Sequence, residues 1–393
     1  MRAKVLKTSL VVILMFFSLL YGMVSYRNHW PPYRLFERAF ERLPYSMQGG
    51  SSVRQIPEIR ALPEPNSKGP LDTDVEALIR IQTPADAEKL RNDLIRFLWG
   101  TPGLPTSYPA TVIQGFSDSR YDDIASLERI DKLVVEMEFG LESNIYHFIP
   151  ANPNNRVVLF HQGHAGDFYN SKENITRLLD DGYAVVAFSM PLLGLNNQPT
   201  VFHSRFGILT ITDHDQMSFL VPEHGHPVKF FVEPVIVALN YLARDYGYSS
   251  VSMVGLSGGG WTTTLAAAMD TRISQSFPVT ASYPMYLRAN SNVTWGDYEQ
   301  VTPDLYETVN YLEMYVLGAY GPGRIQLQIL NKFDPCCFNG TVSKTYKDVV
   351  QTRVHQLGAG EFDILLDDTH REHIISYAAM GEILRGLREW GPK

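Results

Sequence analysis

Short, continuous apolar runs alternate with amphipathic stretches through the C-terminal two-thirds of the chain. A short apolar run bounded by turn residues is typical of a strand buried on both faces of a sheet. Such runs occupy residues 156–161, 184–189, 250–254, 275–280, 325–330 and 362–366. Helical spacing marks residues 172–180, 228–246, 262–269 and 375–390. This alternation predicts an α/β fold with a mostly parallel central sheet flanked by helices.

Two further features modify this simple pattern. Residues 127–138 and 143–149 read as two strands joined at Gly140, and they come before the other predicted strands. Residues 283–323 interrupt the alternation and are rich in aromatic residues, which suits an inserted cap. These side chains could line a pocket or simply pack the cap, and the sequence favours neither. They are Tyr283, Tyr286, Trp295, Tyr298, Tyr306, Tyr311, Tyr315 and Tyr320.

The region before residue 127 lacks the alternation. Residues 27–75 contain many Pro, Arg and Ser residues without a sustained period, which is typical of a stalk or a surface strap. From residue 72 to residue 99 the apolar positions recur at helical spacing, and Thr83-Pro84-Ala85-Asp86 is a helix-start signal. We therefore expect an irregular or helical region at 27–126, followed by one domain at 127–393.

The extreme N-terminus carries a targeting signal. Arg2, Lys4 and Lys7 precede an apolar run at residues 10–24, which is the pattern of an export signal or a short membrane anchor. No small-x-small cleavage site is evident, so an uncleaved anchor within residues 1–26 is slightly favoured. Because the basic residues lie on the N-terminal side, the rest of the chain is expected outside the cytoplasm, either membrane-anchored or secreted.

Composition excludes several function classes. The chain has 393 residues, 45% of them hydrophobic, and a formal net charge of −8, which argues against nucleic acid as a partner. Its two cysteines, Cys336 and Cys337, are adjacent, so a disulfide framework and a cysteine-rich zinc site are excluded. We expect two reduced thiols. A vicinal disulfide stays open because the compartment could be oxidising.

The strongest chemical signal is a G-x-S-x-G motif centred on Ser257. A tight turn between a strand and a helix exposes the serine hydroxyl, and small neighbours are required because side chains there would collide with the strand and helix. An apolar run at 251–254 precedes the motif and helix-forming residues 265–268 follow it, which is the context that this turn demands. The motif reads Gly255-Leu256-Ser257-Gly258-Gly259. Ser257 is therefore the candidate nucleophile.

With this motif in its strand-to-helix context, the chain from about residue 127 to its end resembles the α/β-hydrolase family. The likeness is to exported esterase-like and prolyl-oligopeptidase-like members. In that family the nucleophile, the acid and the histidine follow in this order. The resemblance implies that Asp334, on the turn after the strand at 325–330, is the acid, and that His373, before the closing helix, is the base. His370 is the alternative base. Asp367 and Asp368 are alternatives to Asp334, although they lie too close to the base in sequence for the usual geometry.

An oxyanion hole needs two backbone N–H groups that point to the developing negative charge. The resemblance implies that one belongs to Gly258, directly after the nucleophile. The other is expected in the loop after the strand at 156–161, from either Gly163 or His164, because the chain reads His-Gln-Gly where the family often has His-Gly. His161 itself could merely tie the loop down.

Other chemistries have weaker support. A patatin-type Ser-Asp dyad would need a glycine-rich oxyanion loop upstream, which the chain lacks. Metal-dependent hydrolysis would have to use one sequence cluster without the His-x-x-x-His spacing: His203, Asp213, His214, Asp215, His224 and His226. We therefore expect a serine hydrolase that needs no cofactor or metal and cleaves small-molecule esters through an acyl-enzyme. A peptidase or amidase of the same fold is one alternative, and a non-catalytic, membrane-anchored binding protein is the other.

Overall fold

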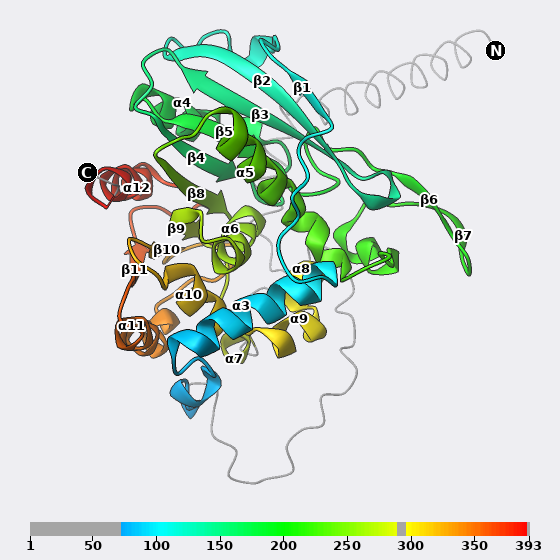
Figure 1. The fold of residues 1–393 in the computed structure, drawn as a ribbon. Helices are drawn as coiled ribbons and strands as arrows, with labels where there is room; N and C mark the ends of the chain where they lie inside the picture. The colour runs from blue at the N-terminus through cyan, green and yellow to red at the C-terminus, as the bar shows by residue number, and fades with distance from the viewer. Residues whose placement is uncertain (1–71, 289–295, 391–393) are drawn as a thin grey trace, which may run out of the picture. The chain divides into compact units, whose positions relative to one another are not determined.

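The computed structural model describes residues 72–288 and 296–390, all within one compact unit that spans residues 68–393. Its centre is a sheet with nine strands among these residues, in the order β1-β2-β3-β5-β4-β8-β9-β10-β11 (Figure 1). The strands are β1 Thr111–Ile113, β2 Leu127–Glu136, β3 Glu142–Pro150, β4 Arg156–His161, β5 Ala184–Phe188, β8 Ser250–Leu256, β9 Ile273–Val279, β10 Ile325–Asn331 and β11 Glu361–Asp367. A separate hairpin consists of β6 Thr200–His203 and β7 Gly207–Thr210.

The strand directions divide the sheet into two parts. The pairs β1–β2, β2–β3 and β3–β5 are antiparallel. From β5 through β4, β8, β9 and β10 to β11 every pair is parallel. The predicted mostly parallel sheet is therefore confirmed, and the parallel part carries the candidate nucleophile and acid at the carboxyl ends of its strands.

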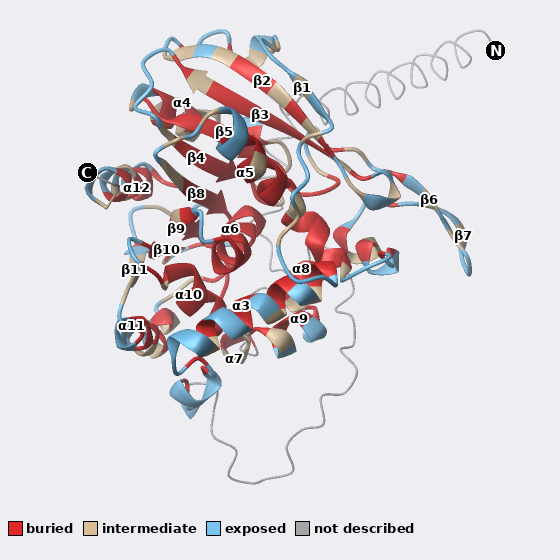
Figure 2. Ribbon diagram, in the orientation of Figure 1, coloured by how far each residue is buried: buried red, intermediate tan, exposed pale blue. Residues whose placement is uncertain are grey.

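Helices cover both faces of the sheet. The α-helices among the described residues are α3 Pro84–Trp99, α4 Lys172–Asp180, α5 Glu233–Asp245, α6 Gly258–Met269, α7 Met285–Arg288, α8 Tyr298–Val301, α9 Pro303–Thr308, α10 Tyr311–Ala319, α11 Lys347–Gln356 and α12 Tyr377–Glu389. Alternate residues of a strand point to opposite faces. In β4, Val157 and Leu159 pack with α5, α6 and α10, whereas Val158 and Phe160 pack with α4 and α12. Both faces of the central strands are buried (Figure 2), which explains their continuous apolar sequence.

Local sequence signals explain how two of these helices begin. The predicted start of α3 is confirmed, because Thr83 and Asp86 form a reciprocal capping box at its first turn. The expected single helix at 228–246 is wrong. A 3-10 turn, η8 (Pro227–Phe231), precedes α5, because Pro234 lacks an N–H and is tolerated only in the first turn of a helix.

The segment between β9 and β10 forms α7 to α10. Every residue of α10 is buried, and this helix packs against α6. The part of the expected cap at 283–323 that forms α10 therefore belongs to the helical layer over the sheet. The short helix α8 lies instead beside the 3-10 helix η7 (His214–Phe219).

The N-terminal predictions fall largely outside the described residues. The expected anchor at 1–26 and the first part of the irregular or helical region, 27–71, precede residue 72, where the description begins. The rest of that region, 72–126, contains α3 and β1. Within 72–288 and 296–390, none of the helices combines the length and apolarity needed to cross a membrane.

Candidate active site

Ser257 occupies the sharp turn between β8 and α6. Its backbone has φ 56° and ψ −122°, a conformation that costs free energy for a residue with a side chain. The turn is held by hydrogen bonds: the N–H of Ser257 donates to the carbonyl oxygen of Val279 at 2.9 Å, and the N–H of Trp261 donates to the carbonyl of Ser257 at 2.9 Å. A methyl group on Gly255 would lie 2.2 Å from the carbonyl oxygen of Gly259, so this position requires glycine.

The loop after β4 packs directly on this turn. A methyl group on Gly163 would lie 2.6 Å from the carbonyl oxygen of Leu256 and 2.7 Å from Cβ of Ser257. A methyl group on Gly258 would lie 2.4 Å from Cε1 of the His164 ring. The three residues expected to form the oxyanion hole, Gly258, Gly163 and His164, are therefore neighbours of the candidate nucleophile.

Asp334 lies on the turn after β10, and it is only 1% exposed. Its Oδ1 accepts hydrogen bonds from the backbone N–H groups of Cys336 at 2.8 Å and Cys337 at 3.1 Å. Its Oδ2 lies 2.8 Å from Nδ1 of His373 and accepts a hydrogen bond from Oγ1 of Thr280 at 3.1 Å. Both carboxylate oxygens are thus fixed in direction.

The charge of Asp334 follows from these partners. Burial acts to raise the pKa of the Asp334 carboxyl, but the hydrogen bond and charge of His373 and the two backbone N–H groups outweigh burial, so the pKa lies below its usual value. An ionised carboxylate only accepts hydrogen bonds. Nδ1 of His373 must therefore carry the proton, which leaves Nε2 of a neutral imidazole with a free lone pair.

The other candidate base has a different environment. Nε2 of His370 lies 3.3 Å from Oδ2 of Asp367, and Nδ1 of His370 accepts the backbone N–H of Glu372 at 3.1 Å. Asp367 itself accepts hydrogen bonds from the hydroxyl groups of Thr369 and Ser376. The structure therefore brings His373, and not His370, to Asp334.

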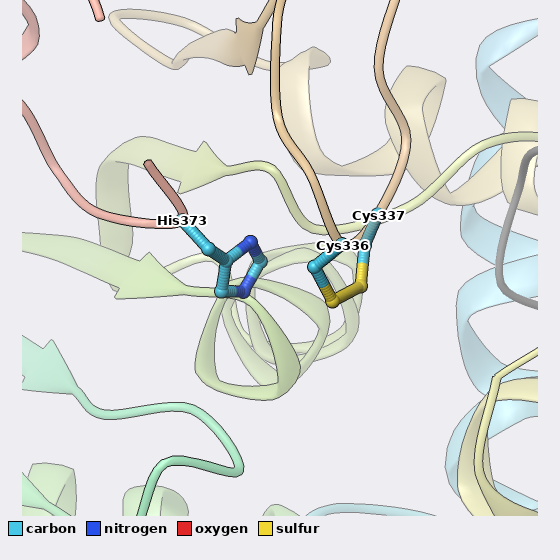
Figure 3. A group of neighbouring side chains, drawn as sticks. All are labelled: Cys336, Cys337 and His373. Atoms are coloured by element: carbon cyan, nitrogen blue, oxygen red, sulfur yellow. A yellow bond between two sulfur atoms is a disulfide. The ribbon is translucent and has the colours of Figure 1, made fainter. Parts of the chain in front are cut away.

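Cys336 and Cys337 form a disulfide bond with each other, so the expectation of two reduced thiols is wrong. Oδ1 of Asp334 accepts the backbone N–H groups of both cysteines, so the disulfide-bonded pair is tied directly to this carboxylate. A ring nitrogen of His373 and the two sulfur atoms lie within 4.8 Å of one another (Figure 3). The disulfide consequently forms part of the surroundings of His373.

His161, at the end of β4, has a structural environment. Its ring is 2% exposed, stacks on Phe188, and its Nδ1 lies 2.9 Å from the carbonyl oxygen of Gln162. Burial lowers the pKa of His161 to about 4, so the ring is neutral at pH 7. It ties down the start of the loop after β4, which contains the candidate oxyanion residues Gly163 and His164.

Three of the aromatic residues of 283–323, Tyr306, Tyr311 and Tyr315, pack in a row. Tyr306 accepts a hydrogen bond from Nε1 of Trp261 at 2.8 Å and bonds the hydroxyl of Tyr311 at 2.7 Å. Tyr283, Tyr311 and Tyr315 are buried. These side chains favour the packing interpretation over a pocket, whereas Trp295 lies outside the described residues.

One group of chemistry-bearing residues was not anticipated. His164, His214, Asp297 and Glu299 place one donor atom each within 4.8 Å of one another, beside the oxyanion loop. Of these only His214 belonged to the suspected metal cluster, and its sequence neighbours Asp213 and Asp215 are not in the group. Nothing in local spacing reveals it, because α8 and η7 bring together residues that are distant in sequence.

Comparison with known proteins supports the fold. No family model and no curated protein sequence matches the chain. Among solved structures, a methylesterase has a TM-score of 0.56 and 15% identity over 77% of this chain and 63% of its own. Acetyl xylan esterase 1 from Thermoanaerobacterium sp. has a TM-score of 0.53 and 12% identity over 80% and 97%. A putative acetyl xylan esterase from Bacteroides fragilis has a TM-score of 0.52 and 16% identity over 77% and 78%.

Proposed function

We propose that this chain, which has the α/β-hydrolase fold, is a serine hydrolase that cleaves carboxylic esters. Ser257 is the nucleophile, His373 the general base and Asp334 the acid that orients the base. The observation that carries the proposal is the 2.8 Å contact between Nδ1 of His373 and a buried, ionised Asp334. A non-catalytic protein would need neither the strained backbone at Ser257 nor an imidazole whose Nε2 lone pair is fixed by a buried carboxylate.

In the proposed reaction, Nε2 of His373 takes the proton of Ser257 Oγ as that oxygen bonds to the ester carbonyl carbon. The negative charge that develops on the carbonyl oxygen is met by the N–H of Gly258 and by that of Gly163 or His164. The intermediate collapses to an acyl-enzyme, and the alcohol leaves with the proton from His373. Water then repeats the sequence, releasing the acid and restoring Ser257. Asp334 stabilises the imidazolium in both halves.

Esters are proposed over amides because of the structural neighbours. The three neighbours described above are named as esterases, and two of them as acetyl xylan esterases. Short acyl groups are therefore the first substrates to test. The proposal includes export, since the basic and apolar N-terminal pattern favours an anchor with the hydrolase domain outside the cytoplasm.

The proposal is tested with the full chain, purified in mild detergent, and with its Ser257→Ala variant. A fluorophosphonate probe, which reacts only with an activated serine, is expected to label the first protein and not the second. A panel of p-nitrophenyl esters from acetyl to longer acyl groups, with a matched p-nitroanilide, is then assayed for turnover. We expect ester hydrolysis that declines with acyl length and is lost in Ser257→Ala.

Two results would contradict the proposal in different ways. A folded chain that takes no label and turns over no ester would favour a non-catalytic binding protein. Faster cleavage of the anilide than of the matching ester would favour an amidase or peptidase on the same residues. Circular dichroism of both proteins shows whether a negative result comes from unfolded material.

A further inference from the structure

Four potential metal ligands converge beside the oxyanion loop. His164 comes from the loop after β4, His214 from η7, and Asp297 and Glu299 from the start of α8. The side chain of Glu299 is fully buried and that of His214 is 7% exposed, whereas His164 and Asp297 reach solvent at 27% and 54%. Two imidazoles and two carboxylates thus form a half-buried group of nitrogen and oxygen donors.

The hydrogen bonds of His214 are incomplete without a positive charge. Its Nε2 lies 2.9 Å from the carbonyl oxygen of Pro191, which can only accept, so Nε2 carries the proton. In a neutral ring Nδ1 then has a lone pair. That lone pair faces Oε2 of Glu299 at 3.5 Å, so two acceptors point to each other.

Glu299 shows the same incompleteness. Its Oε2 is buried and has no hydrogen-bond partner among the described residues. Its Oε1 lies 2.9 Å from Nε2 of His164, and the same nitrogen lies 3.0 Å from Oδ2 of Asp297. One imidazole N–H cannot be directed well to two carboxylates. A single cation among the four side chains would complete the unpartnered oxygen and the lone pair on Nδ1 of His214, and it would take the place of the shared proton on Nε2 of His164.

The spacing suits a small transition metal. Ligands bound tetrahedrally at about 2.0–2.1 Å lie about 3.3 Å from one another. Three contacts within the group run from 2.9 to 3.5 Å, and all four donor atoms lie within 4.8 Å of one another, so small rotations of the side chains would accommodate the ion. Imidazole donors favour Zn²⁺ and its neighbours over Mg²⁺ and Ca²⁺, which prefer oxygen alone.

We propose that His164, His214, Asp297 and Glu299 bind one divalent transition metal ion, with Zn²⁺ as the matching class. The ion would join the oxyanion loop to η7 and to α8, and it would fix the ring of His164 where that ring covers Gly258. Its role is positional, because it organises the loop from which an oxyanion donor comes. This role rests on the proposed esterase function, whereas binding of the ion does not.

The competing explanation is a purely ionic group. Two doubly protonated imidazoles would also balance the two carboxylates, and the pKa of His214 is raised accordingly: burial acts to lower it, but the hydrogen bond and charge of Glu299 outweigh burial. Burial acts to raise the pKa of Glu299, but the two imidazoles of His164 and His214 outweigh burial and lower it to about 2. Both shifts belong to the ionic arrangement and do not support a metal ion. Binding measurements distinguish a metal ion from protons.

The experiment uses the full chain with Ser257→Ala, purified without a histidine tag and stripped with a chelator. Zn²⁺ binding is followed by competition with a chromophoric chelator, and Co²⁺ binding by its visible absorption. We expect one equivalent of Zn²⁺ and, with Co²⁺, the intense bands of a four-coordinate ion. Glu299→Gln keeps the side chain's shape and removes its charge, and it is expected to weaken Zn²⁺ binding about 100-fold.

Glu223→Gln is the matched control, because Glu223 also lies beside a histidine, the exposed His224, at 3.9 Å. This substitution is expected to leave Zn²⁺ binding unchanged. If the folded, stripped chain takes up no stoichiometric Zn²⁺ and shows no Co²⁺ bands, the ionic explanation holds and the proposal fails. Equal Zn²⁺ affinity in Glu299→Gln and Glu223→Gln would also overturn it. The Co²⁺ spectrum needs no variant, so an unfolded Glu299→Gln protein leaves the test intact. Because Ser257 is absent throughout, failure of the esterase proposal cannot produce these outcomes.

Discussion

Replacing Asp334 with Asn tests the proposed triad through hydrogen-bond direction. Oδ1 of Asp334 accepts two backbone N–H groups, from Cys336 and Cys337. An asparagine must place its carbonyl oxygen there, since an NH₂ group would face two donors. Its NH₂ group then occupies the position of Oδ2, 2.8 Å from Nδ1 of His373. His373 has to present a lone pair at Nδ1 and carry its proton on Nε2.

This tautomer is the wrong one for a base that must accept the serine proton at Nε2. A base locked in the wrong tautomer lowers kcat by about 10⁴-fold, which corresponds to about 5.5 kcal/mol of transition-state stabilisation. The side chain keeps its volume and most of its partners, so KM is expected to change by less than about 3-fold. We expect the residual rate of Asp334→Asn to rise at alkaline pH, where hydroxide can assist.

The assay is steady-state hydrolysis of the best p-nitrophenyl ester from pH 5 to pH 10. Circular dichroism shows that each variant is folded. Asp367→Asn, beside the alternative base His370, is the matched control and is expected to retain kcat within about 5-fold. The reasoning is refuted if Asp334→Asn keeps more than a tenth of the kcat, or if Asp367→Asn loses as much as Asp334→Asn does.

Three further outcomes are expected. In ester turnover assays, His373→Ala is expected to lose at least about 10³-fold in kcat, and His370→Ala less than about 10-fold. The reverse order would assign the base to His370. Asp131 is buried, and although burial opposes it, hydrogen bonds from Arg129, Gly115 and Tyr246 lower its pKa. Its stabilisation is complete above about pH 4 and is lost as pH falls through the folded pKa. In urea titrations, Asp131→Asn should therefore destabilise the chain by about 2 kcal/mol at pH 7 and flatten the acid-side loss. Mass spectrometry under denaturing conditions should find Cys336 and Cys337 alkylated only after reduction.

The sequence predicts the sheet well because its signals are local. The strand at 156–161 and the helix at 172–180 match β4 and α4 in both bounds. Each segment has one uninterrupted hydrophobic pattern and is bounded by turn residues. The helix at 228–246 fails at one residue, Pro234, whose effect on the backbone overrides an apolar pattern that continues through it. The β6–β7 hairpin escapes notice because its strands bury little and so carry no clear apolar alternation.

The candidate site divides in the same way. A motif with a rigid local geometry identifies Ser257, and chain order within a resembling family suggests Asp334 and His373. The group at His164 and Glu299 could not be found, because 135 positions separate these residues and only the packed fold brings them together. The sequence leaves a vicinal disulfide open beside two reduced thiols, because the adjacency of Cys336 and Cys337 does not decide whether their sulfur atoms bond. The structure contains that bond.

The close packing of Gly163 and Gly258 on the serine turn limits how this protein could be altered by evolution or by design. Any side chain added at either position would meet the backbone of β8 or the ring of His164 at less than contact distance. Substitutions of Gly163 or Gly258 are therefore expected to abolish function rather than to change preference. A library intended to change the accepted acyl group should leave these two glycines fixed.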